Sequence, residues 1–126
     1  MLQSPTILLV EDELIAAEIV CLTLEENGFR VTGVARTAAE ALASVGKERP
    51  ALALVDIRLA RGDDGVTLAR TLRRDFGVPV IIMSASSDPG TQGRAAEAGV
   101  LGFITKPYRA AALVAEIRRV LGSEGP

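Results

Sequence analysis

The chain has 126 residues, of which 48% are hydrophobic and only 3% aromatic, so we expect one domain with a core of Val, Leu, Ile and Ala. Its formal net charge of −2 gives no basic footprint for nucleic acid or for an anionic membrane surface. The single cysteine, Cys21, excludes an intrachain disulfide and a cysteine-built zinc site, and we expect its thiol to be buried. No apolar run approaches the roughly 18 residues of a membrane span, and residues 1–10 lack the charged region of a signal peptide, so we expect a cytoplasmic protein.

Short apolar runs alternate along the chain with segments that carry apolar residues at helical spacing. The apolar runs predict five strands, at residues 6–10, 29–35, 51–56, 78–83 and 101–105. The segments between and after them predict five helices, at about residues 15–27, 38–47, 66–76, 91–98 and 110–121. Because crossovers between parallel strands are right-handed, this alternation predicts an α/β fold with an open, doubly wound parallel sheet.

Two helices carry patterns that the structure can test. The first predicted helix places Ile15, Ile19 and Leu22 on one apolar stripe, with Val20 and Leu24 beside it. The second has Thr37 as its expected N-cap, and Glu40 three residues later completes the pattern of a capping box.

Polar side chains follow four of the predicted strands, at the point where each strand ends. Glu11 and Asp12 follow the first strand, Asp56 ends the third, Ser84 follows the fourth, and Lys106 follows the fifth. Ligands of open parallel sheets bind at the carboxyl ends of the strands, so we expect these five side chains to converge. Each alone has a structural interpretation as a helix-start carboxylate, a turn residue or a solvated loop charge. Their joint placement favours a functional site.

Such a cluster has a definite chemistry. Neighbouring carboxylates repel one another unless a cation lies between them, and Mg²⁺ prefers carboxylate, phosphate and water oxygens. Lys106 offers a second positive charge to phosphate oxygens, and Ser84 offers a hydroxyl donor. An aspartate such as Asp56 can attack phosphorus and form an aspartyl-phosphate, a transfer that depends on positioning and electrostatic stabilisation.

The chain resembles the receiver domain of two-component response regulators over about residues 5–122. The matching segments are residues 7–13, 54–56, 64–65, 81–85 and 102–107. The resemblance implies a flavodoxin-like five-stranded sheet in the order 2-1-3-4-5 with five helices. It also implies that residues 1–126 form a single receiver domain. Residues 123–126 follow the last helical pattern, and we expect them to be a flexible tail.

The resemblance assigns roles to individual residues. It implies that Asp56 is the phosphoacceptor and that Mg²⁺ is bound directly by Asp12 and Asp56, by the backbone carbonyl of Arg58, and by Glu11 through water. Ser84 would be the hydroxyl switch and Lys106 the invariant lysine. In the same way, Phe103 would be the aromatic switch that moves inward when Ser84 shifts toward the phosphoryl group.

The loop at residues 58–65 departs from the family pattern. It lacks the usual Met-Pro pair, and it reaches its Asp-Gly pair with one residue more than is usual. Arg58 also brings a long cation to the rim of the site, and our hypothesis is that its guanidinium partly neutralises the acidic cluster by pairing with Glu11.

These features together predict a signalling switch, not an enzyme, that catalyses only its own phosphorylation and dephosphorylation. The resemblance implies that the phosphodonor is a histidine kinase or a histidine phosphotransfer protein. Because the sequence has no histidine, any phosphohistidine chemistry must involve another protein. We expect phosphorylation to change the face formed by residues 91–121, so that the chain binds a downstream protein target or relays the phosphoryl group to a histidine phosphotransfer protein. The same face is a candidate homodimer surface, and we expect no nucleic-acid and no membrane partner. The chain is either a stand-alone receiver or part of a longer regulator or hybrid kinase.

Three alternatives differ in chemistry. A pseudo-receiver would bind a protein without being phosphorylated, and the intact Asp12, Asp56, Ser84 and Lys106 argue against it. A phosphohydrolase of the haloacid-dehalogenase type resembles a pattern with a second Asp two residues after the nucleophile, where this chain has Arg58. A nucleotide-binding domain would have a Gly-rich turn after the first strand, where this chain has three carboxylates.

Overall fold

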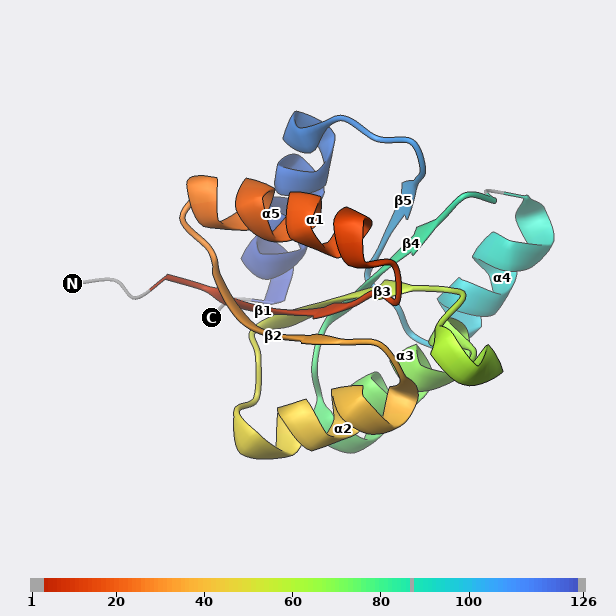
Figure 1. The fold of residues 1–126 in the computed structure, drawn as a ribbon. Helices are drawn as coiled ribbons and strands as arrows, with labels where there is room; N and C mark the ends of the chain where they lie inside the picture. Colours follow the sequence, from red (N-terminus) through yellow and green to blue (C-terminus); the bar gives the residue numbers. More distant parts are fainter. Residues whose placement is uncertain (1–3, 87, 125–126) are drawn as a thin grey trace.

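The computed structural model describes residues 4–86 and 88–124, which form one parallel sheet covered by helices on both faces (Figure 1). The strands are β1 (Thr6–Val10), β2 (Arg30–Ala35), β3 (Leu52–Asp56), β4 (Val80–Ser84) and β5 (Gly102–Thr105). Their order in the sheet is β2-β1-β3-β4-β5, and every neighbouring pair is parallel, so the predicted fold is confirmed.

The helices lie in two layers. They are α1 (Leu14–Glu26), α2 (Ala38–Lys47), α3 (Gly65–Phe76), α4 (Pro89–Glu97) and α5 (Ala110–Glu124), with a single 3₁₀ turn, η1 (Ala60–Gly62), between β3 and α3. Helices α1 and α5 cover one face of the sheet, and α2 and α3 cover the other (Figure 1). Within the described residues, none of the helices has the length and apolar character that a membrane crossing requires.

The central strands are buried on both faces, because alternate side chains of a strand point to opposite sides. In β1, Ile7 and Leu9 belong to the core under α1 and α5, whereas Leu8 and Val10 belong to the core under α2 and α3. All four are completely buried. Burial on both sides explains why these strands are continuous apolar runs, and it leaves the polar residues at their carboxyl ends as the exception.

Helix α1 is rotated relative to the stripe seen in the sequence. Its buried residues are Ala17, Val20 and Leu24, whereas Ile19 and Leu22 are each 60% exposed. The helix carries apolar residues on two faces. Spacing alone therefore did not show that the face with Ala17, Val20 and Leu24 packs on the sheet. Cys21 is only half-buried, so the expectation of a buried thiol is not met.

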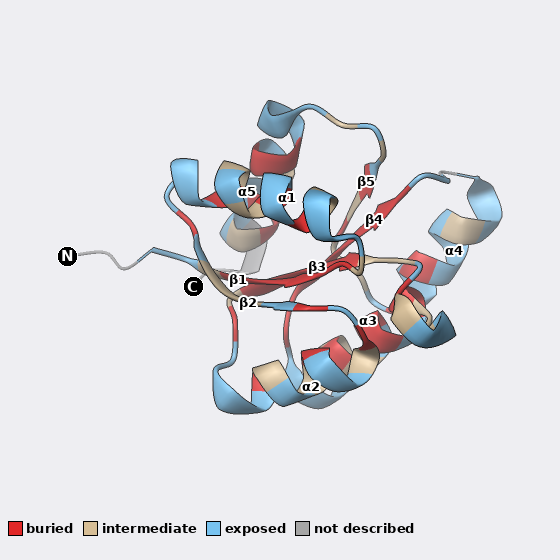
Figure 2. Cartoon of the chain, in the orientation of Figure 1, coloured by how far each residue is buried: buried red, intermediate tan, exposed pale blue. Residues whose placement is uncertain are grey.

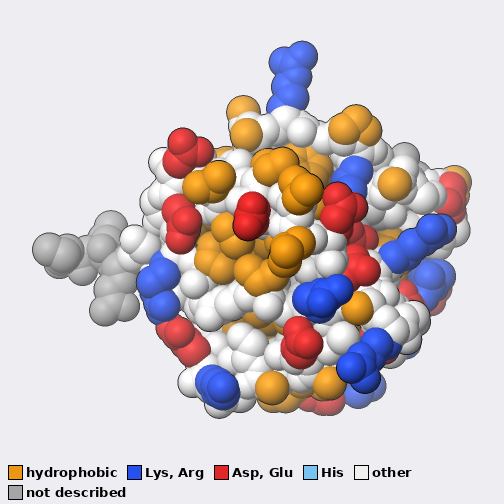
Figure 3. All heavy atoms as spheres, viewed as in Figure 1, with side chains coloured by type: hydrophobic (Ala, Val, Ile, Leu, Met, Phe, Trp, Pro, Cys, Tyr) orange, Lys and Arg blue, Asp and Glu red, His pale blue; other side chains and the backbone are white. Residues whose placement is uncertain are grey.

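The exposed apolar face of α1 is extensive. It consists of Leu14, Ile15, Ile19 and Leu22, with Val34 of the edge strand β2 nearby. Figure 2 shows the outer side of α1 as exposed, and Figure 3 shows apolar side chains gathered over this region of the surface. Exposed patches of this kind usually mark contacts with other molecules.

Two predicted helix ends differ from the structure in detail. Thr37 caps α2 as expected, since its hydroxyl accepts a hydrogen bond from the Glu40 N–H at 3.1 Å. The Glu40 carboxylate, however, accepts from the N–H of Arg36 at 2.9 Å and not from that of Thr37. Helix α5 continues to Glu124, so the tail expected from residue 123 does not begin there, and residues 125–126 lie outside the described residues.

Candidate functional site

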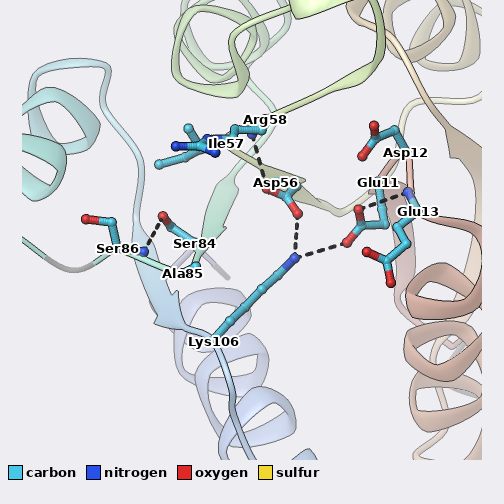
Figure 4. Close-up of a pocket in the computed structure, with 10 residues that line it drawn as sticks. All are labelled: Glu11, Asp12, Glu13, Asp56, Ile57, Arg58, Ser84, Ala85, Ser86 and Lys106. Carbon is cyan, nitrogen blue, oxygen red and sulfur yellow. Dashed lines mark hydrogen bonds and ion pairs between the residues drawn. The ribbon is translucent and has the colours of Figure 1, made fainter.

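An open pocket of about 390 Å³ lies at the carboxyl edge of the sheet. Figure 4 shows the residues that line it, which come from the ends of β1, β3, β4 and β5: Glu11, Asp12, Glu13, Asp56, Ile57, Arg58, Ser84, Ala85, Ser86 and Lys106. The five side chains that the sequence predicted to converge all line this one pocket.

Sheet register explains the convergence. Asp56 is paired with Met83, so Ser84 lies one residue beyond it on the neighbouring strand β4. The N–H of Lys106 donates to the Ser84 carbonyl at 2.7 Å, which continues the pairing of β4 with β5 past the last strand residue. Parallel strands that end at one level therefore bring residues from distant parts of the sequence within reach of Asp56.

The ammonium group of Lys106 lies between two carboxylates (Figure 4). It donates to Oδ2 of Asp56 and, at 3.2 Å, to Oε1 of Glu11. The second carboxylate oxygen of Glu11 accepts from the N–H of Glu13 at 3.2 Å. The Glu11 side chain is only 3% exposed, so Lys106 provides the charge that a buried carboxylate requires.

Burial and charge shift the titration of this group. Burial raises the pKa of the Glu11 carboxyl, the nearby Asp56 charge adds to the rise, and the Glu13 N–H and Lys106 offset it only in part. Burial alone would lower the pKa of Lys106, but the hydrogen bonds and charges of Asp56 and Glu11 together outweigh it, and the pKa is raised. Lys106 therefore stays charged at neutral pH.

The donor atoms at this edge suit a hard cation. Within the described residues, no group of three or more acidic, histidine or cysteine side chains is arranged to hold a metal ion by itself. Mg²⁺ does not need such a group, because it keeps several waters and uses one or two protein carboxylates. Asp12 and Asp56 line the same pocket, so two carboxylates are available there, and Arg58 lines it as well.

The two predicted switch residues occupy different settings. Ser84 is buried at 6% exposure, and its hydroxyl accepts a hydrogen bond from the N–H of Ser86 at 3.0 Å. Phe103 is half-buried against the core under α2 and α3, and its N–H donates to the carboxylate of Glu116 at 3.3 Å. The involvement of Glu116 was not predicted, because no local sequence signal links a helix residue to a strand amide.

The hypothesis about Arg58 is wrong in its choice of partner. Its backbone N–H donates to Oδ1 of Asp56 at 3.1 Å, and its side chain is exposed. In residues 4–86 and 88–124, the ion pair with Glu11 is made by Lys106 and not by Arg58. The reason is geometric. Lys106 follows β5 and reaches the buried Glu11, whereas the side chain of Arg58 is exposed on the loop after β3.

The longer loop after β3 is well structured. Gly65 N donates to the Ile57 carbonyl at 2.7 Å, and Arg58 and Asp64 form an antiparallel bridge, so the loop closes as a small hairpin. Asp64 caps α3, accepting from Val66 N at 3.2 Å, as a carboxylate directly before a helix would suggest.

Comparison with known proteins gives a consistent result. A family model described as the response regulator receiver domain matches residues 7–118. The transcriptional regulatory protein CseB of Streptomyces coelicolor is 42% identical over 115 residues, 91% of this chain and 48% of that protein. The DNA-binding response regulator MtrA of Mycobacterium tuberculosis is 36% identical over 112 residues, 89% of this chain and 48% of that protein.

Solved structures agree with this match. The signal receiver domain of a modulated diguanylate cyclase from Desulfovibrio desulfuricans superposes with a TM-score of 0.87 at 34% identity, covering 96% of both chains. A CheY-like receiver domain protein from Methanospirillum hungatei gives the same TM-score at 27% identity, with 96% of both chains covered. The chain spans about half the length of the curated relatives it matches. Since those relatives are named as DNA-binding or transcriptional regulators, the comparisons do not support the expectation of no nucleic-acid partner.

Proposed function

The chain belongs to the response regulator receiver domain family, and we propose that it is a signalling switch activated by phosphorylation of Asp56. The observation that carries the proposal is the ion pair between Lys106 and Asp56 at the carboxyl edge of the sheet. A carboxylate that ends a buried strand has no packing role, and a lysine beside it is placed to neutralise an arriving phosphoryl group. The alternative of a pseudo-receiver without phosphorylation finds no support in the comparisons.

We propose Mg²⁺ as the metal, held by the carboxylates of Asp12 and Asp56 and the backbone carbonyl of Arg58, with Glu11 acting through water. The metal would supply positive charge to the phosphoryl oxygens during transfer. Glu11 suits an indirect role, because its two oxygens already accept hydrogen bonds from Lys106 and from the N–H of Glu13.

Three side chains of the pocket have separate roles in phosphoryl transfer. A carboxylate oxygen of Asp56 forms the new bond to phosphorus while the bond between phosphorus and the donor's leaving atom breaks. Lys106 turns its ammonium from Asp56 to a phosphoryl oxygen, which stabilises the negative charge. Ser84 donates its hydroxyl to another phosphoryl oxygen, and its present bond from Ser86 N is the contact that this movement would give up.

The donor is proposed to be a histidine kinase or histidine phosphotransfer protein, because the chain belongs to the response regulator receiver family. The chain has no histidine of its own, so a phosphohistidine must lie on another protein. A donor has to reach Asp56 across the rim of the pocket, and α1 starts at this rim. The exposed apolar residues Leu14, Ile15 and Ile19 therefore give the donor a surface to contact. The acidic Glu18 between them favours a partner that is basic at that point.

For the output, we propose that phosphorylation changes the face at residues 91–121, which binds a downstream target or a second copy of the chain. Of the residues of helix α4, Ala95 alone is buried, and its side chain is small, so movement of the helix breaks few core contacts. The matched relatives are DNA-binding or transcriptional regulators about twice as long, so we propose control of DNA binding as the eventual output, through an effector joined to this domain or bound by it.

Intact mass spectrometry tests the proposal directly. The protein is incubated with Mg²⁺ and acetyl phosphate, alongside Asp56→Asn and a sample without Mg²⁺. We expect a gain of one phosphoryl group in the wild type alone. If no gain is seen, binding of beryllium fluoride as a stable phosphoryl mimic separates rapid dephosphorylation from inactivity, and failure of both would overturn the proposal.

A further inference from the structure

We infer that Asp63 is a positioning residue for the phosphorylation site. Its carboxylate ties the loop at residues 58–64 to the start of α2, and the loop in turn holds the main chain of Arg58 beside Asp56. This inference rests on the proposed function, because the Arg58 carbonyl matters only if a metal binds there.

Two hydrogen bonds attach the loop to a segment far away in the sequence, and the one that the Asp63 carboxylate accepts is the tie. Oδ2 of Asp63 accepts from the N–H of Ala38 at 2.8 Å. The N–H of Ala60 donates to the carbonyl of Arg36 at 3.0 Å. The loop is therefore attached to the residues that begin α2 on both sides of Thr37. The charge of Asp63 also suits its place, since a carboxylate is stabilised near the amino terminus of a helix.

A short covalent and hydrogen-bonded path connects the tie to the site. Leu59 N donates to the Asp63 carbonyl at 3.2 Å, so the residue after Arg58 is bonded to the residue that carries the tie. Arg58 N donates to Oδ1 of Asp56 at 3.1 Å. The main chain of Arg58 is thus held from one side by the phosphoacceptor and from the other by the anchored tip of the loop.

This loop needs an anchor more than a shorter one would. It contains no proline to restrict its backbone. Its tip has two successive residues in the left-handed region, Arg61 at φ 64° and Gly62 at φ 73°, and this region is unfavourable for arginine. Without the tie from Asp63, the chain gains freedom to leave this conformation, and the Arg58 carbonyl loses its fixed position.

Removal of the tie should spare the fold. Helix α2 keeps its own cap, because the Thr37 hydroxyl accepts from the N–H of Glu40, a different donor from the one that Asp63 satisfies. The Asp63→Ala variant should therefore fold, and the substitution should affect only the conformational freedom of the loop. Asp63→Asn removes the charge but keeps an oxygen acceptor for Ala38 N, which separates the hydrogen bond from electrostatics. Asp75→Ala removes an equal charge at the far end of α3 and serves as the control.

Isothermal titration calorimetry with Mg²⁺ alone provides the first readout. We expect Asp63→Ala to raise the Mg²⁺ dissociation constant about three- to tenfold, the range that loss of a charge-assisted hydrogen bond permits. Asp63→Asn should lie closer to the wild type, and Asp75→Ala should change little. Equal weakening in Asp63→Ala and Asp63→Asn would mean that charge alone acts, and it would overturn the inference.

Amide hydrogen exchange in the absence of metal provides the second readout. We expect faster exchange at Arg58 and Ala60 in Asp63→Ala, without a matching change in β3. Unchanged amide exchange together with unchanged Mg²⁺ affinity would show that Asp63 does not position the loop, and it would overturn the inference. Failure of the wild type to take up a phosphoryl group would instead overturn the proposed function, and the exchange at Arg58 would still test the anchor.

Discussion

Lys106 donates hydrogen bonds to Asp56 and Glu11 at once, which makes it the cation that balances the acidic edge of the sheet. In Lys106→Met, the buried Glu11 would keep its N–H partner and lose its charged one. We expect the free energy of unfolding to fall by about 1–3 kcal/mol, the cost of leaving a buried polar group short of a partner. Urea denaturation measures it, and Lys47→Met, which changes an exposed lysine of α2, is the control.

The same variant should bind Mg²⁺ more tightly. Removing an ammonium from the side of Asp56 removes its repulsion of the metal, which is about 1 kcal/mol for two unit charges roughly 4 Å apart in water. Phosphoryl uptake from acetyl phosphate should nevertheless fall, because Lys106 no longer neutralises the phosphoryl oxygens. Weaker Mg²⁺ binding in Lys106→Met would contradict this account of the pair.

Gly65 is required by close packing against the backbone of Asp56. A Cβ atom built on Gly65 would lie 2.0 Å from the backbone oxygen of Asp56, a contact that cannot be relieved by a side-chain movement. We expect Gly65→Ala to lower the free energy of unfolding by about 3 kcal/mol or more and to displace Asp56. Gly46→Ala is the matched control, because Gly46 lies in α2 with open space around it and the change should stabilise by about 0.5–1 kcal/mol. Similar stability of the two variants would count against this packing argument.

Topology explains why much of the site could be predicted from the sequence. Strand ends in a parallel sheet share one edge, so the sequence alone predicts that Asp12, Asp56, Ser84 and Lys106 lie close together. The partners within that edge depend on side-chain reach, which the sequence does not encode locally. For this reason Lys106, and not Arg58, proved to be the partner of Glu11.

Side-chain contacts between segments far apart in the chain could not be predicted from the sequence. The Asp63 carboxylate accepts a hydrogen bond from the N–H of Ala38, and the Asp64 carboxylate accepts one from the Arg94 guanidinium. Nothing in the sequence around either acidic residue identifies its partner. The one-residue extension of the loop was visible, but its 3₁₀ turn depends on contacts with α2 that form only in the folded chain.

The Arg94–Asp64 ion pair links α4 to the cap of α3. Helix α4 is otherwise held mainly by Ala95, with the buried Ala98 just beyond its end, so this pair should contribute to its resting position. We expect Arg94→Gln to speed amide exchange in α4 while changing the free energy of unfolding by only about 0.2–1 kcal/mol, as is usual for exposed pairs. Glu97→Gln, on the same helix, should leave exchange unchanged, and equal exchange in both variants would show that the pair does not hold α4.

Asp88 should make stability depend on pH in the acid range. Its carboxylate accepts hydrogen bonds from Ser86 and from Thr91, the latter at the start of α4, and the Ser86 bond is the main cause that lowers the pKa of Asp88 from 3.8 to about 2. A carboxyl with a lower pKa in the folded state stabilises above its unfolded pKa, and the contribution is lost as pH falls from about 4 to 2. Melting temperatures of the wild type should therefore drop more over this range than those of Asp88→Asn. Parallel curves for the two proteins would contradict the assignment.

Two leucines on α1 provide the sharpest test of how this helix packs. Leu24 is completely buried under the helix, whereas Leu22 is 60% exposed on its outer face. Leu24→Ala should lower the free energy of unfolding by about 2–5 kcal/mol, because it leaves a cavity in the core. Leu22→Ala should change it by no more than about 0.5 kcal/mol, since the side chain already lies in water. The same substitution in the same helix cancels the difference in helix propensity, so urea denaturation of the pair reports burial alone. A comparable loss in both variants would mean that the outer face of α1 is covered, for instance by a second copy of the chain, and a concentration-dependent midpoint would then identify that self-association.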